Sequence, residues 1–197
     1  MTSHYYTTSR RRGLYSLISD FIRGVTVEFE VAPGVFSCEE VDKGTKILLE
    51  YAIVPESGTV LDIGCGYGVI GIVLAKVNPR LRVYMVDINR EAVKLAKKNI
   101  KRNRVEDRVT VLWGDLYEPV KGMKFRAIYS NPPLAAGMDV VRRIIYEAPQ
   151  HLESGGMLQI VVRKGAEAVR KAMLEAFGNV EKLVSKEGYK VFLSRLE

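Results

Sequence analysis

The spacing of apolar residues changes in a regular way from about residue 58 onward. Short apolar runs, typical of buried strands, alternate with segments whose apolar residues recur every three or four positions, as in amphipathic helices. The pattern predicts strands at residues 59–63, 81–86, 108–112, 126–130 and 157–162, and helices at 69–77, 90–102, about 140–152 and about 169–177. Repeated strand–helix units indicate a parallel sheet with helices on both faces.

The last two apolar runs, residues 180–185 and 189–194, are separated only by a short link that contains Glu187 and Gly188. A link of this length joins antiparallel neighbours. The predicted fold class is therefore α/β, with a Rossmann-like, doubly wound sheet that is mostly parallel and has one antiparallel strand near an edge.

Residues 1–57 follow a different pattern. Residues 25–31 alternate between apolar and polar like a half-exposed strand, Pro33 and Gly34 end that strand, and residues 47–53 indicate a short helix. We interpret residues 1–57 as an elaboration of a single domain, such as a lid or a substrate-binding appendage. Residues 58–197 form the core of that domain.

Composition narrows the class of protein. The 197 residues carry 30 basic and 23 acidic side chains, and the net charge of +7 favours a polyanionic partner such as RNA. The only cysteines, Cys38 and Cys65, argue against a disulfide framework and favour the cytoplasm. His4 and His151 are far apart and no ligand cluster accompanies the cysteines, so we expect no metal site. We also expect no membrane association, because no apolar stretch has the length of a membrane helix and no secretory signal is evident.

A glycine-rich loop follows the first core strand. It reads Asp62-Ile-Gly64-Cys65-Gly66-Tyr-Gly68 and directly precedes a predicted helix. Glycines allow sharp turns and close approach of a ligand to the backbone, and the start of a helix offers free N–H groups. Ligands of open α/β sheets bind at the carboxyl ends of the strands, so this loop is the first candidate for a binding site.

The same loop also fits a rival function. Gly66, Gly68 and Gly71 match the GxGxxG spacing of dinucleotide-binding proteins, and Asp87 follows the second strand, so a nucleotide-cofactor oxidoreductase is an alternative. Asp62 argues against it, because a carboxylate beside a bound pyrophosphate is unfavourable, whereas a carboxylate beside a cationic amino group is favourable. Asp87 does not discriminate, since it could accept from the ribose hydroxyls of either ligand.

The third strand ends at Gly114-Asp115-Leu116. Asp115 could accept a hydrogen bond from an adenine amino group, with Leu116 or Ile88 covering the ring. A turn or helix-capping role is the equally simple reading of this aspartate.

Asn131-Pro132-Pro133-Leu134 ends the fourth strand. Each proline fixes φ and removes a backbone N–H, so the chain leaves the sheet in a stiff, extended turn. Asn131 has an amide acceptor, and the carbonyl of Pro132 is a second acceptor that regular structure leaves free. Two acceptors held side by side suit a planar amino group.

Taken together, these motifs resemble a known family. In their order and spacing they are similar to those of class I S-adenosylmethionine-dependent methyltransferases: Asp62-x-Gly64-x-Gly66-x-Gly68, Asp87, Asp115 and Asn131-Pro-Pro-Leu134. A narrower similarity, in residues 34–37, 41–45 and 48–49, is to the catalytic half of the small-subunit ribosomal RNA guanine-N2 methyltransferases. The resemblance implies a seven-stranded sheet whose last strand is antiparallel.

The resemblance also implies a site for the cofactor S-adenosylmethionine. The glycine loop would border its methionine part, Asp87 would bind its ribose and Asp115 its adenine. The full implied set is Asp42, Lys43, Gly44, Thr45, Asp62, Gly64, Cys65, Gly66, Gly68, Asp87, Ile88, Asp115, Leu116 and Asn131.

The implied reaction is methylation of an exocyclic amine of a nucleobase in RNA. Catalysis would lie in Asn131, Pro132, Pro133 and Leu134, and guanine N2 of ribosomal RNA is the first candidate target, with transfer RNA as another. Methylation of a protein glutamine amide or of a small-molecule amine is the alternative, because it uses the same hydrogen-bonding logic.

Leu134 departs from the family pattern, which has an aromatic residue there to stack on the target base. Phe36, Tyr67 or Tyr129 could take over that stacking role. Phosphate contacts are expected from basic side chains: Arg10, Arg11 and Arg12 of an amino-terminal basic arm that also includes Arg23, and Arg142 and Arg143 after the proline turn.

Overall fold

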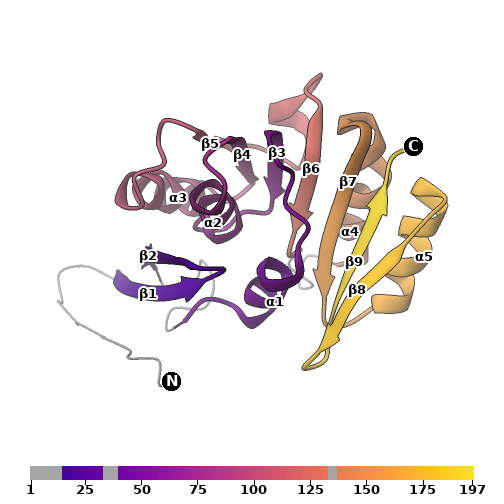
Figure 1. The fold of residues 1–197 in the computed structure, drawn as a ribbon, viewed down its shortest axis with the longest axis horizontal. Helices are drawn as coiled ribbons and strands as arrows, with labels where there is room; N and C mark the ends of the chain where they lie inside the picture. The colour runs from indigo at the N-terminus through magenta and orange to yellow at the C-terminus, as the bar shows by residue number, and fades with distance from the viewer. Residues whose placement is uncertain (1–14, 33–39, 133–136) are drawn as a thin grey trace.

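The computed structural model describes residues 15–32, 40–132 and 137–197. Its main feature is a seven-stranded sheet with the strand order β5-β4-β3-β6-β7-β9-β8 (Figure 1). Only β9 runs antiparallel to its neighbours, β7 and β8. The strands are β3 (Gly58–Ile63), β4 (Leu81–Asp87), β5 (Val109–Trp113), β6 (Phe125–Ser130), β7 (Leu152–Val162), β8 (Glu181–Lys186) and β9 (Tyr189–Arg195). The predicted fold class is confirmed.

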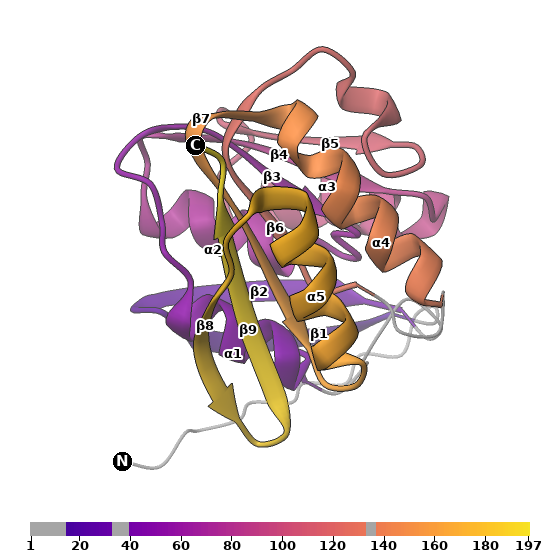
Figure 2. The same cartoon turned by 90° about the vertical axis from the view of Figure 1, so that its right-hand side faces the viewer.

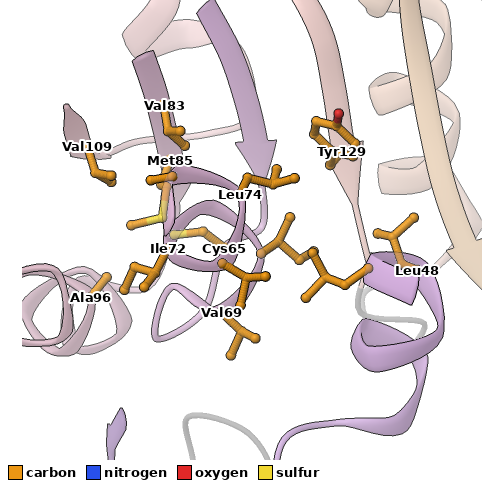
Figure 3. Close-up of a cluster of buried hydrophobic side chains, with 14 of the residues drawn as sticks. Leu48, Cys65, Val69, Ile72, Leu74, Val83, Met85, Ala96, Val109 and Tyr129 are labelled. Atoms are coloured by element: carbon orange, nitrogen blue, oxygen red, sulfur yellow. The ribbon is translucent and has the colours of Figure 1, made fainter. Parts of the chain in front are cut away.

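Helices cover both faces of this sheet, as Figure 2 shows. One face packs against α1 (Lys43–Tyr51), α2 (Val69–Val77) and α3 (Arg90–Arg102), and the other against α4 (Met138–Glu147) and α5 (Ala166–Phe177). The sheet has two core clusters, the first on the side of α1, α2 and α3 and the second on the side of α4 and α5. Successive strand residues point to opposite faces, so Val60 belongs to the first cluster and Leu61 to the second. Figure 3 shows part of the first cluster, in which Ile72 of α2 and Met85 of β4 are buried together.

Two predicted helix boundaries were wrong. Leu152 was expected on a helix face, but a short 3-10 turn, η3 (Ala148–His151), ends the helical segment and Leu152 begins β7. A second 3-10 turn, η1 (Glu118–Val120), precedes β6. The helix expected at residues 47–53 starts earlier, at Lys43, because the side chain of Asp42 caps it by accepting the Thr45 N–H at 2.9 Å.

The amino-terminal part contains a strand that was not predicted from the sequence. β1 (Ser16–Ile22) pairs antiparallel with the predicted strand β2 (Val25–Val31), and Arg23 and Gly24 form the connecting turn with φ of 54° and 84°. The guanidinium of Arg23 donates to the carbonyls of Leu49 and Ala52, at 2.6 and 2.8 Å. Arg23 therefore caps the end of α1, and its assignment to a free basic arm was wrong.

Asn99 of α3 and Asn103, which caps the carboxyl end of that helix, complete the open edge of β2. Asn99 accepts from the N–H of Glu30 at 2.7 Å and donates to its carbonyl at 3.0 Å. Asn103, one turn later, makes the same pair of bonds with Glu28, at 3.1 and 2.7 Å. Asn99 also donates to the carbonyl of Tyr67 at 2.9 Å. These side chains take the place of a third strand and hold the hairpin against the helix layer.

We expect Asn99→Ala to loosen this hairpin. Asn99 is fully buried, and its loss removes the side-chain partner of both the N–H and the carbonyl of Glu30, at about 1–3 kcal/mol for each group. Urea unfolding should show a drop of several kcal/mol, and amide exchange at Glu30 should accelerate. Unchanged exchange at Glu30 would contradict the docking role of Asn99.

Candidate active site

The predicted site residues come together along one edge of the sheet. The register pairs Asp87 with Trp113, Ile63 with Val86, and Ile63 with Ser130, so the carboxyl ends of β5, β4, β3 and β6 are adjacent. The segments that follow these strands therefore form a row. In spatial order the row contains Asp115, Asp87, the glycine loop and Asn131.

A small open pocket lies at the inner end of this row, where the segment after β3 meets the segment after β6. Of the predicted site residues, six line it, and three further lining residues come from the loop and the first turn of α2. The lining residues are Asp42, Thr45, Gly64, Cys65, Gly66, Tyr67, Val69, Ile70 and Asn131. Val69 and Ile70 had no motif of their own, although they directly follow the glycines.

The loop is held by its neighbours in the sheet. Asp87 accepts the N–H of Gly66 at 2.8 Å with one carboxylate oxygen and the N–H of Asn89 at 2.8 Å with the other. Gly68, which caps α2, has φ of 102°, a conformation that strongly favours glycine. Each oxygen of Asp87 retains a lone pair, so the carboxylate can hold the loop and accept from a ligand at the same time.

Asp62 lies behind the loop rather than on the pocket wall. Its side chain is fully buried, and one oxygen accepts the N–H of Gly71 at 3.1 Å. The other oxygen, Oδ1, has no hydrogen-bond partner among the described residues. The pKa of Asp62 is raised to about 7, mainly by burial, with a smaller contribution in the same direction from the charge of Asp87. Burial and these two carboxylates also raise the pKa of the Cys65 thiol well above its usual value.

Asn131 is held through its amide nitrogen. Nδ2 donates to Asp42 Oδ2 at 2.7 Å and to Thr45 Oγ1 at 2.9 Å. Asp42 and Thr45 belong to the first turn of α1, which lies beside β7 and β9 (Figure 1). The structure therefore joins two motifs that lie 86 residues or more apart in the chain.

The outer end of the row is more exposed. Asp115 pairs with Arg143 of α4 at 2.8 Å, and Arg143 also contacts Glu147 at 3.2 Å. The hydrogen bond that Arg143 donates to Asp115 is the main cause of a raised pKa of Arg143. Arg142 lies 3.8 Å from Asp139. Both arginines that were predicted to contact phosphate thus face carboxylates, and Arg143 ties Asp115 to α4.

Four other predicted residues lie outside the lining of this pocket. Lys43 is exposed and pairs with Glu187, outside the pocket lining. Ile88 is 66% exposed, whereas Leu116 is 9% exposed and belongs to the core. Tyr129 is fully buried and its hydroxyl donates to the carbonyl of Ile53 at 2.7 Å, so its suggested role in stacking on a base was wrong.

Several predictions lie outside the described residues, namely those for Arg10, Arg11, Arg12, Phe36, Pro133 and Leu134. Within the described ranges, no three side chains of the His, Cys, Asp or Glu type group as metal ligands would. In the same ranges no helix is both long enough and apolar enough to cross a membrane.

The family model described as "Methyltransferase small domain" matches residues 26–193 of this chain. The chain belongs to the methyltransferase small-domain family. This membership confirms the resemblance to class I methyltransferases, whose cofactor is S-adenosylmethionine, and it disfavours the oxidoreductase alternative.

Individual relatives and one solved structure are similar to most of this chain. "Uncharacterized protein YbxB" of Bacillus subtilis is 34% identical over 99% of both chains. Ribosomal RNA small subunit methyltransferase C of Hamiltonella defensa is 32% identical over 98% of this chain and 58% of its own length. The solved T. thermophilus 16S rRNA N2 G1207 methyltransferase (RsmC), in complex with AdoMet and guanosine, superposes with a TM-score of 0.85 at 28% identity, over 94% of this chain and 52% of that one. The chain thus spans little more than half the length of these two ribosomal RNA methyltransferases.

Proposed function

We propose that this protein is an S-adenosylmethionine-dependent N-methyltransferase that acts on guanine N2 of ribosomal RNA. The observation that carries the proposal is the row of Asp115, Asp87, the glycine loop and Asn131 at the carboxyl edge of the sheet. It matches the order in which the adenine, ribose, methionine and target amine would lie.

The row also has a suitable size for the cofactor. Adjacent strands are about 4.8 Å apart, so the three steps from β5 to β6 span about 14 Å, comparable to an extended nucleoside with an amino-acid tail. Asp87 offers free lone pairs for ribose hydroxyls. The buried carboxyl group of Asp62, with one oxygen unpartnered among the described residues, lies behind the loop, and a cationic methionine end bound there would favour its ionised form. When bound, S-adenosylmethionine supplies a methyl group activated by its sulfonium.

The protein's own contribution is alignment and charge stabilisation. Asn131 Oδ1 and the Pro132 carbonyl would accept the two hydrogens of the target amine. These bonds favour the partial positive charge that develops on the amine nitrogen and orient its lone pair toward the pocket. A strong general base is unnecessary, because the product ammonium readily loses its proton to water.

Three observations support RNA as the substrate. The net charge of +7 suits a polyanion, and two similar proteins carry names that specify ribosomal RNA. The neighbour of known structure was solved with guanosine. A base within a duplex would have to be flipped out to reach Asn131, so an unpaired guanine is the expected target. A cytoplasmic location follows from this substrate and is part of the proposal.

The test is transfer of radiolabelled methyl groups from S-adenosylmethionine to three acceptors: unmodified small-subunit ribosomal RNA, unmodified transfer RNA and a protein lysate. We expect label in the ribosomal RNA, recovered as N2-methylguanosine by nucleoside mass spectrometry. Binding of that RNA should weaken steeply with added salt, as phosphate contacts require. Label confined to protein would overturn the proposal in favour of a glutamine amide.

A further inference from the structure

The side-chain amide of Asn131 can face its surroundings in two ways, and only one suits an amine. With its oxygen outward the amide accepts hydrogen bonds, and with its nitrogen outward it donates them. A target amine that must give up hydrogens needs the oxygen. The orientation of this one group therefore decides whether the site can act on an amine.

The surroundings of Asn131 determine that orientation. Asp42 Oδ2 lies 2.7 Å from Nδ2, and an ionised carboxylate is only an acceptor, so the amide nitrogen must face it. Thr45 Oγ1, at 2.9 Å from Nδ2, takes the second N–H. Because both amide hydrogens are engaged, Oδ1 is the polar atom of this side chain that remains for a substrate.

Asp42 and Thr45 are themselves held rigidly. Asp42 Oδ2 also accepts the backbone N–H of Thr45 at 2.9 Å, which caps α1. Gly44 between them lies against β9: a Cβ atom there would be 2.8 Å from Cε1 of Tyr189. The first turn of α1 thus lies in contact with the sheet and presents two acceptors to Asn131 at a constant position.

We propose that Asp42 and Thr45 are positioning residues that set the polarity of the Asn131 amide, so that its oxygen faces the target amine. This inference rests on the proposed N-methyltransferase function. It assigns to the turn at residues 42–45 a role in orienting the catalytic side chain, in addition to the cofactor contact that the resemblance implies.

Reversal of the pair tests the proposal. Oδ2 of Asp42 accepts both the Thr45 N–H that caps α1 and an N–H of Asn131, so Asp42→Ala removes both bonds, whereas Asp42→Asn can keep both with its amide oxygen. At saturating S-adenosylmethionine we expect the kcat of Asp42→Ala to fall about 100-fold, the loss typical of one well-placed catalytic hydrogen bond, and Asp42→Asn to recover most of it. In Asn131→Asp two carboxylates face each other, so activity should fall and its pH optimum should move downward, where the pair shares a proton.

The double variant Asp42→Asn/Asn131→Asp restores a donor opposite an acceptor. One oxygen of the introduced carboxylate accepts from the introduced amide, whose nitrogen turns toward it and gives up the cap of α1, and the other oxygen remains for the target amine. We expect kcat at least tenfold above the value calculated by multiplying the two single losses. A purely multiplicative result would overturn the proposal, because independent sites combine in that way.

Further variants test the hydroxyl of Thr45 and control for the change in charge at Asp42. Thr45→Val removes the hydroxyl while keeping the shape and should lower kcat, whereas Thr45→Ser should recover most of it. Asp107→Asn removes the same charge at an exposed position, where Asp107 pairs with Arg108, and should not change kcat. If the wild-type protein methylated no RNA, the proposed function would fail. The four-protein cycle would then be measured in unfolding free energy, where additivity would refute the pairing.

Discussion

Asn131→Ala should abolish methyl transfer while leaving cofactor binding intact. The substitution removes the acceptor that faces the target amine, and a lost hydrogen bond of this kind costs about 100- to 1,000-fold in kcat. The Kd for S-adenosylmethionine, measured by calorimetry, should change little, because the pocket keeps Asp87 and the loop that Asp87 holds. Single-turnover assays with saturating RNA would separate this loss in chemistry from a loss in RNA affinity.

Asn103→Ala is the matched control. It also removes a buried amide with several hydrogen bonds, but at the hairpin edge and away from the pocket. We expect lower stability and unchanged kcat below the unfolding transition. Unchanged turnover in Asn131→Ala would refute the amine-gripping role of Asn131, and an equal loss in both variants would point to a general effect on stability.

The second large effect concerns pH and stability. Asp62 has a pKa of about 7 in the folded protein, against an ordinary value of 3.8, because it is buried. Below pH 4 the carboxyl is protonated in both states and its burial costs little. Between pH 4 and pH 7 the unfolded chain releases the proton while the folded protein retains it, so stability falls as pH rises and then levels off. About three pKa units correspond to roughly 4 kcal/mol at most.

Asp62→Asn should remove this dependence. We expect the variant to match the wild-type protein near pH 4 and to exceed its melting temperature at pH 8 by up to about 8–16 °C, since one kcal/mol shifts the melting temperature of a chain of this size by about 2–4 °C. Asp107→Asn, the same charge change at the surface, controls for net charge. Parallel curves of melting temperature against pH for wild type and Asp62→Asn would show that Asp62 does not cause the effect.

The alternation of apolar and polar residues predicted the hairpin of β8 and β9 but not strand β1 of the amino-terminal hairpin. The two-residue turn at Glu187 and Gly188 was recognised because clear apolar runs flank it, and the structure confirms β8 and β9. Arg23 and Gly24 form the same kind of turn, with φ positive at both residues, yet β1 was missed. The outward side of β1 carries the exposed apolar residues Leu17 and Phe21, which obscure the alternation of a half-buried strand.

The asparagines of α3 and the arginine at the hairpin turn had no local signal at all. Asn99 and Arg23 both read as ordinary polar residues, because their partners lie 69 and 26 or more positions away in the chain. A polar side chain that satisfies the backbone of a distant element cannot be distinguished in sequence from one that faces water.

The sequence by itself determined how strands and helices follow one another along residues 58–197, the mostly parallel sheet and the motifs that end its strands. Apolar periodicity and the restricted angles of proline and glycine act over a few residues, so they can be recognised locally. Only the tertiary structure decided what those motifs do to each other. It brought Asp42 and Thr45 to Asn131, placed Asp62 behind the loop and paired Arg143 with Asp115. Those contacts depend on strand order and on helix packing, which join residues far apart in the chain, and burial and charge pairing follow only once the sheet has assembled.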